Sequence, residues 1–214
     1  MKGLSIVGLE VARAKRVLLR DFSLEIRVGE RVGLRGPSGS GKSSLLRAIC
    51  GLDDPSAGSV RLGGSDPEQI GWPTFRRRVM LVPQRSTFPP GRVSAVLRLP
   101  FAFKSAPAVP SDQALRAALE RVGIGETWEQ MAAQLSEGQA QRLALVRALS
   151  MEPDFVLLDE PTSALDGPAA AAVEALVRDE GSRRGLGALI VTHDSDQAER
   201  WCDRTVDLQV GAHA

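Results

Sequence analysis

A glycine-rich string in the first quarter of the chain has the spacing of a phosphate-binding loop. Residues 36–43 read Gly-Pro-Ser-Gly-Ser-Gly-Lys-Ser, which satisfies the pattern G-x-x-x-x-G-K-[ST]. Glycines let consecutive backbone N–H groups curl around a phosphate, while Lys42 can reach the outer phosphates and the Ser43 hydroxyl can ligate Mg²⁺. The string therefore predicts a nucleoside triphosphate site formed by Gly36, Pro37, Ser38, Gly39, Ser40, Gly41, Lys42, Ser43 and Ser44.

A pair of carboxylates follows an apolar run in the last third of the chain. Residues 155–158 are all apolar, which is typical of a strand buried on both faces. Such a strand delivers Asp159 and Glu160 to the carboxyl edge of a parallel sheet, where ligands bind. We expect Asp159 to hold Mg²⁺ and Glu160 to act as the general base toward an attacking water. The alternative is a solvated turn into Pro161.

The elements that must position these residues follow from the apolar pattern. Period-two alternation and short apolar runs predict strands in the first part of the chain, and apolar residues at helical spacing predict a helix from the glycine-rich loop to Gly51. The predicted strands there span residues 4–11, 22–26, 31–35 and 79–82, with one more inside the turn-rich stretch 53–66. After residue 150, strand and helix alternate, which indicates a parallel sheet with helices on its faces. The predicted order is strand 155–158, helix 168–180, strand 188–191, helix 195–202 and strand 205–209.

The middle of the chain has a different character. From about residue 86 to residue 150, prolines separate short amphipathic helices. The simplest organisation is an α/β core made of residues 1–85 and 151–214, with a helical insertion at 86–150.

Composition narrows the class of protein. The 214 residues carry 27 basic and 26 acidic side chains, so the net charge of +1 provides no overall field that would attract nucleic acid or an anionic bilayer. The two cysteines, Cys50 and Cys202, are too few for a disulfide framework. No signal-peptide pattern and no apolar run of about 18 residues occurs in the sequence. We therefore expect a cytoplasmic protein, or one that reaches a membrane only through a partner.

Four further short strings complete a set. Leu135-Ser136-Glu137-Gly138-Gln139 precedes a predicted helix at 138–149, and Gln84 ends the string at 81–84. The strings at 163–166 and 191–194 contain Asp166 and His193. With the phosphate loop and the carboxylate pair, these strings resemble, in order and spacing, the ATP-binding subunits of ABC transporters over nearly the whole chain.

The resemblance implies a P-loop NTPase core with a mainly parallel sheet, N-terminal antiparallel β strands and an inserted helical subdomain. It implies ATP and Mg²⁺ as cofactors, and a second copy of the chain whose phosphate loop faces the signature residues Ser136, Gly138 and Gln139. Gln84 would join the metal or the water, and Asp166 would lie at the dimer seam. His193 would contact the γ-phosphate and Glu160.

Two positions depart from the pattern of the family. Glu137 replaces a glycine, and we expect its side chain to point outward, because inward it would repel a bound phosphate. The family stacks adenine on an aromatic residue, but residues 10–15 contain none and the chain has no tyrosine. Arg13 is the candidate that could stack on the base instead, the alternative being an exposed arginine on a hairpin. We expect loose selectivity for the base.

The function implied is ATP hydrolysis that drives a separate integral-membrane permease, with the chain held on the inner face of the membrane by that permease. Phe88, Phe101 and Phe103 are candidates for a permease groove, with packing inside the helical unit as the alternative. A narrower resemblance, at residues 75–84 and 206–209, is to bacterial ATPases of an iron-exporting transporter. The second hypothesis is a soluble ABC-type ATPase module acting in DNA repair or translation, although the balanced charge argues against binding to nucleic acid.

Overall fold

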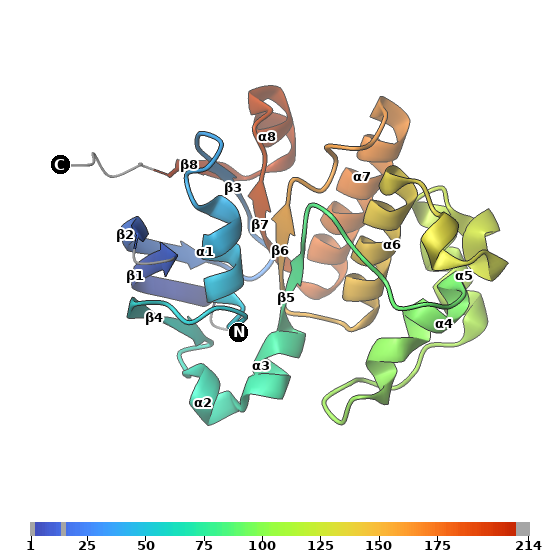
Figure 1. The fold of residues 1–214 in the computed structure, drawn as a ribbon, viewed down its shortest axis with the longest axis horizontal. Helices are drawn as coiled ribbons and strands as arrows, with labels where there is room; N and C mark the ends of the chain where they lie inside the picture. The colour runs from blue at the N-terminus through green and yellow to red at the C-terminus, as the bar shows by residue number, and fades with distance from the viewer. Residues whose placement is uncertain (1–2, 14–15, 209–214) are drawn as a thin grey trace.

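Two β-sheets and the helices that cover them make up the computed structural model, which describes residues 3–13 and 16–208 (Figure 1). The larger sheet has five strands, all paired in parallel, in the order β5-β6-β7-β3-β8. These strands are β3 (Arg31–Arg35), β5 (Val79–Val82), β6 (Phe155–Asp159), β7 (Gly187–Val191) and β8 (Arg204–Asp207). The parallel sheet confirms the predicted α/β class.

The smaller sheet is antiparallel and has the order β2-β1-β4. Its strands are β1 (Leu4–Arg13), β2 (Arg16–Ile26) and β4 (Ala57–Leu62). It confirms the antiparallel strands expected near the N-terminus. However, β2 begins earlier than the predicted strand at 22–26. Register shifts along its pairing with β1 interrupt the period-two pattern, so the sequence did not indicate a strand before residue 22.

The helices divide between the two faces of the parallel sheet. Figure 1 shows α1 and the antiparallel sheet on one side, with α6 and α7 on the other. The α-helices are α1 (Lys42–Ile49), α2 (Pro67–Ile70), α3 (Trp72–Arg78), α4 (Val93–Arg98), α5 (Asp112–Arg121), α6 (Glu137–Ser150), α7 (Gly167–Arg184) and α8 (Ser195–Trp201). The 3-10 helices are η1 (Leu99–Ala102), η2 (Gly125–Glu129) and η3 (Ala132–Gln134). The sequence pattern missed α2 and α3, which follow a turn-rich stretch and contain few apolar residues.

Alternate residues of the central strands enter two separate apolar clusters. Phe155 and Leu157 of β6 pack with α1 and the antiparallel sheet, whereas Val156 and Leu158 pack with α4–α7. A strand whose residues are buried on both faces must be apolar throughout, which explains the unbroken run before Asp159.

One apolar cluster extends across the predicted boundary at residue 150. Val146 and Leu149 of α6 belong to the same cluster as Val82 and Leu158 of the sheet. The division into residues 1–85 with 151–214 and residues 86–150 stays a prediction.

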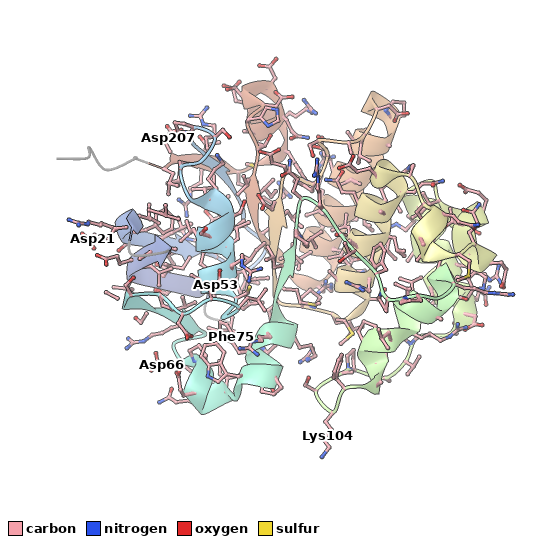
Figure 2. The ribbon with its side chains drawn as sticks, in the orientation of Figure 1. Asp21, Asp53, Asp66, Phe75, Lys104 and Asp207 are labelled. Carbon is pink, nitrogen blue, oxygen red and sulfur yellow. The ribbon has the colours of Figure 1, made fainter. Side chains whose placement is uncertain are left out.

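The edge strand β8 pairs in parallel with β3, and an ion pair lies at each end of this pairing. Arg35 contacts Asp207, which is labelled in Figure 2, at 3.0 Å, and Arg31 contacts Asp203 at 2.7 Å. The predicted strand at 205–209 extends to Gln209, which lies outside the described residues. Within residues 3–13 and 16–208, no helix combines the length and the apolar character needed to cross a lipid bilayer.

Candidate nucleotide-binding and hydrolysis site

The glycine-rich loop connects β3 to α1. Gly39 and Gly41 have φ angles of 76° and 92°, in the left-handed region that glycine enters without steric cost. The buried Lys42 ammonium donates hydrogen bonds to the carbonyl oxygens of Gly36 and Pro37, at 2.7 and 2.8 Å. These two bonds fold the loop around the lysine, so the curled backbone predicted from the glycine spacing is present.

The loop borders a cavity of about 350 Å³. Its lining residues are Leu18, Ser38, Gly39, Gly41, Lys42, Ser43, Ser44, Gln84, Asp159 and Glu160. The Ser40 hydroxyl is buried and has no hydrogen-bond partner within the described part of the chain. Ser40 itself does not line the cavity, whereas Lys42 does, and it brings a positive charge to the cavity at the N-terminus of α1. The loop therefore fits an anionic ligand.

Asp159 lies at the carboxyl end of β6, where its side chain accepts a hydrogen bond from Ser43. Burial raises the pKa of Asp159, as does the charge of the neighbouring Glu160, whereas the Ser43 hydrogen bond and the Lys42 charge oppose the rise. One carboxylate and one hydroxyl are the kind of oxygen ligands that Mg²⁺ uses beside substrate phosphates. The pair Ser43 and Asp159 therefore fits this ion.

Glu160 has an unusual backbone that three neighbours hold in place. Its φ angle is 47°, which is uncommon for a residue with a side chain. Its N–H donates to the Val191 carbonyl at 3.0 Å. Its own carbonyl accepts hydrogen bonds from the Gln141 amide at 2.7 Å and from the Ser163 hydroxyl at 3.1 Å. This left-handed turn directs the Glu160 carboxylate away from the strand.

The Glu160 carboxylate receives two polar side chains from distant segments. The Gln84 amide donates to its Oε2 at 2.8 Å, and His193 Nδ1 lies 3.6 Å from its Oε1. The His193 side chain is 72% exposed, compared with 23% for Glu160. The structure thus brings together three predicted residues that span positions 84 to 193 of the chain.

The predicted signature residues lie elsewhere. Ser136 caps α6 by accepting a hydrogen bond from the Gln139 N–H at 3.2 Å, and the Gln139 side chain accepts one in return from the Ser136 N–H at 3.0 Å. A Cβ added at Gly138 would lie only 2.8 Å from the Ala164 carbonyl oxygen, so glycine permits this close approach. None of Ser136, Gly138 and Gln139 is among the residues that line the cavity at the phosphate loop.

Two other predicted positions have local partners. Glu137 points outward, as expected because an inward carboxylate would repel a bound phosphate. Its side chain lies 3.5 Å from the exposed Arg85 guanidinium. Asp166 caps α7 by accepting a hydrogen bond from the Ala169 N–H at 2.9 Å. It does not line the cavity.

The sequence argument missed Leu18 and Gln141. Leu18 of β2 lines the cavity and lies against Gly41, but a single leucine in a strand carries no signal of ligand contact. Gln141 is buried in α6, and a polar residue at a buried helix position is the signal that identifies it. The question whether Arg13 stacks on a base falls outside the described part of the structure, because the side chain of Arg13 is not described.

A second cavity, of about 500 Å³, lies where the segment after Gln84 meets the start of α6. Phe88 lines it, and Arg147 lies over the Phe88 ring at 5.0 Å from the centroid. Phe88 also packs against the larger apolar cluster. Phe101 and Phe103 are not among the lining residues, and Phe103 is 68% exposed beside Lys104, which projects outward in Figure 2. Phe88 therefore lines this cavity without Phe101 and Phe103.

Comparison with known proteins places this geometry in a family. Residues 19–163 match the family described as ABC transporter. A lipoprotein-releasing system ATP-binding protein, LolD, from Pseudomonas fluorescens is 38% identical over 91% of this chain and 88% of its own length. A methionine import ATP-binding protein, MetN 2, from Paraburkholderia xenovorans is 36% identical over 90% of this chain, which spans only 51% of that relative.

A solved structure matches over nearly the whole chain. It is the dimeric structure of a post-hydrolysis state of the ATP-binding cassette MJ0796 bound to ADP and Pi. Its TM-score is 0.85, with 28% identity over 97% of this chain and 95% of that one. The match covers both sheets and the helical segment. The chain belongs to the ABC transporter family and carries the ATP-hydrolysing domain of that family.

Proposed function

We propose that this chain is the ATP-hydrolysing subunit of an ABC transporter, in which two copies close on ATP and Mg²⁺ and drive a separate membrane permease. The observation that carries the proposal is the position of Glu160. It lies at the edge of the phosphate-loop cavity, and both Gln84 and His193 contact its carboxylate.

The proposed chemistry is an attack of water on the γ-phosphorus of ATP, which breaks the bond to the bridging oxygen of the β-phosphate and releases ADP and phosphate. Glu160 accepts the proton of that water, and its left-handed backbone holds the carboxylate over the cavity. His193 and Gln84 orient the carboxylate and the water, and the Lys42 ammonium stabilises charge on the transferred phosphoryl group. Mg²⁺, held by Ser43 and Asp159, would neutralise phosphate charge.

A second copy is proposed because the phosphate-loop cavity of one chain is not lined by the N-terminus of α6. The N-terminus of α6, with Ser136 as its cap, is the kind of helix end that binds anions, yet it does not line the phosphate-loop cavity of its own chain. In the proposed dimer it faces the γ-phosphate held by the other copy, and Asp166 lies at the seam. The dimeric relative bound to ADP and Pi supports this arrangement.

The test is the substitution Glu160→Gln. It keeps the size and hydrogen bonding of the side chain but cannot accept a proton, so ATP turnover should fall by roughly 100-fold or more while ATP binding and ATP-dependent dimerisation persist. Steady-state phosphate release and size-exclusion chromatography measure the two effects. The control is Glu180→Gln, which neutralises a buried carboxylate of α7 away from the cavity. Wild-type turnover in Glu160→Gln would overturn the proposal.

The transported molecule is a finer proposal. We propose iron export, on the resemblance noted at residues 75–84 and 206–209; the last of these, Gln209, lies outside the described residues. The two relatives described above serve other cargoes, in lipoprotein release and in methionine import. The test is co-purification with the product of an adjacent permease gene, followed by metal efflux from loaded vesicles. ATP-driven efflux of iron supports the assignment, and its absence in a complex with active ATPase refutes it.

A further inference from the structure

A buried hydrogen-bond network lies directly behind the two proposed catalytic side chains. Its centre is Gln197 of α8, which is 5% exposed. The Gln197 amide nitrogen donates to the Thr162 hydroxyl at 2.7 Å and to the Glu174 carboxylate at 3.0 Å. Its amide oxygen accepts a hydrogen bond from the Thr192 hydroxyl at 2.9 Å. The amide therefore uses both of its N–H groups and its oxygen.

The network joins the two segments that carry the proposed catalytic residues. Thr162 lies two residues after Glu160, and Thr192 immediately precedes His193. The Thr192 hydroxyl also accepts a hydrogen bond from the Asp194 N–H at 3.1 Å, so the turn around His193 is tied to the same amide. One side chain thus connects the backbone on either side of the contact between Glu160 and His193.

The carboxylate of Glu174 favours an amide, rather than a second carboxylate, at position 197. Glu174 is 4% exposed and pairs with Arg200 at 2.8 Å, so it accepts hydrogen bonds and cannot donate them while it is ionised. An amide satisfies this carboxylate. A second carboxylate at position 197 would place two like charges in contact at a buried site.

We propose that Gln197 is a positioning residue, which sets the separation of Glu160 and His193 through Thr162 and Thr192. The inference rests on the proposed roles of Glu160 and His193. A buried network in which every member is paired holds its segments rigidly, and small displacements of reacting groups are costly to rate. Loss of the network should therefore act on turnover more than on nucleotide binding, because Gln197 does not line the cavity.

The experiment exchanges the side chains of Gln197 and Glu174. Gln197→Glu should lower kcat by roughly 10- to 100-fold, with the ATP dissociation constant unchanged within about threefold. Glu174→Gln alone should have little effect on kcat, because an amide oxygen still accepts the Gln197 hydrogen bond. The double variant, Glu174→Gln with Gln197→Glu, restores one carboxylate and one amide and should return kcat to within about threefold of wild type. A role in stability alone would lower the free energy of unfolding of Gln197→Glu but would leave kcat per folded molecule unchanged.

Controls separate this inference from the proposed function. Glu180→Gln removes a buried carboxylate from the same helix, α7, without touching the network, and should leave kcat unchanged. Glu160→Gln is measured in parallel. If Glu160→Gln keeps wild-type turnover, the proposed function fails. If Glu160→Gln is inactive but folded Gln197→Glu has wild-type kcat, or if the double variant is not rescued, only the positioning role fails.

A milder pair of variants covers the case in which Gln197→Glu does not fold. Thr162→Val and Thr192→Val each remove one hydroxyl from the network and keep the shape of the side chain. Each should lower kcat about three- to tenfold, on the scale of a single hydrogen bond. Wild-type kcat in both folded valine variants would overturn the proposal.

Discussion

At the scale of single residues, the two adjacent carboxylates have different environments and therefore suit different tasks. Asp159 is 8% exposed, in contact with the phosphate loop through Ser43. Glu160 leaves the line of the strand through its left-handed backbone and meets Gln84 and His193. A buried carboxylate beside a hydroxyl suits a metal ion, whereas a carboxylate at the cavity edge suits a water molecule.

Replacing Asp159 by Asn should separate stability from function. Burial raises the pKa of Asp159, so ionisation of this group costs folding free energy, and the cost grows as the pH rises from its unfolded pKa through its folded pKa. At pH 7.5, without nucleotide, Asp159→Asn should unfold at higher urea concentration than wild type, and the difference should vanish near pH 4. Turnover should fall by at least roughly 100-fold, because the proposed metal ligand is lost. Lower stability of the variant at pH 7.5 would contradict this.

Selectivity for the base should be weak. Of the described residues that line the phosphate-loop cavity, none is aromatic, and Leu18 is the apolar contact. An aliphatic side chain can pack against any base, but it has no hydrogen-bond donor or acceptor with which to distinguish adenine from guanine. We expect kcat/KM for ATP and GTP to agree within about tenfold, and Leu18→Ala to weaken the binding of both nucleotides by the same factor. A strong preference for ATP would show that a residue outside this set reads the base.

At the scale of elements, α5 and α6 each begin with a serine cap, but the two helix N-termini have different surroundings. Ser136 accepts from the N–H three residues on at the start of α6, and Ser111 does the same at the start of α5, each at 3.2 Å. The caps satisfy the same orphan donors, so their local energies are alike. Only the first turn of α6 approaches the segment after Glu160, through the contact of Gly138 with Ala164.

This pair of caps gives a matched test of the proposed dimer. Ser136→Ala and Ser111→Ala should each lower the free energy of unfolding by about 1 kcal/mol, measured by urea denaturation. Only Ser136→Ala should also reduce ATP turnover, by roughly tenfold or more, because its hydroxyl is proposed to face the phosphate of the other copy. Equal turnover in the two variants would argue against that role of Ser136.

At the scale of the whole molecule, the site depends on how the sheet is assembled. The phosphate loop follows β3, Gln84 follows β5, Glu160 follows β6 and His193 follows β7. All these strands are parallel, so their carboxyl ends meet at one edge. A Glu160–Gln84 contact across 76 residues of chain exists because β5 and β6 are neighbours.

Cys50 is buried and Cys202 is partly buried, and the packing around them affects the reactivity of both thiols. Burial raises the pKa of Cys50 and of Cys202 to about 11. The thiolate is the reactive form, so at pH 7.5 the native protein should react with a thiol reagent roughly 100-fold more slowly than the protein unfolded in guanidinium. A time course of thiol labelling with and without denaturant measures this. Rapid labelling of the native protein would contradict the raised pKa of these thiols.

Much of the fold could be predicted from local pattern. The apolar run before Asp159, the glycine spacing of the phosphate loop and the predicted helices at 138–149 and 168–180 are properties of a few consecutive residues, and the structure contains each of them. The helices α2 and α3 and the early start of β2 could not be predicted. Their residues lack a clear period, and pairing and packing decide their conformation.

The sequence alone determined the chemistry available to this protein, because residue type and close spacing set which groups can bind phosphate, hold Mg²⁺ or accept a proton. The tertiary structure decided which of these groups meet. Strand order placed Gln84 and His193 on Glu160, left the cap of α6 outside the cavity of its own chain, and buried Gln197 between Thr162 and Thr192. Such contacts join residues that are far apart in the chain, so a pattern in a few consecutive residues cannot predict them.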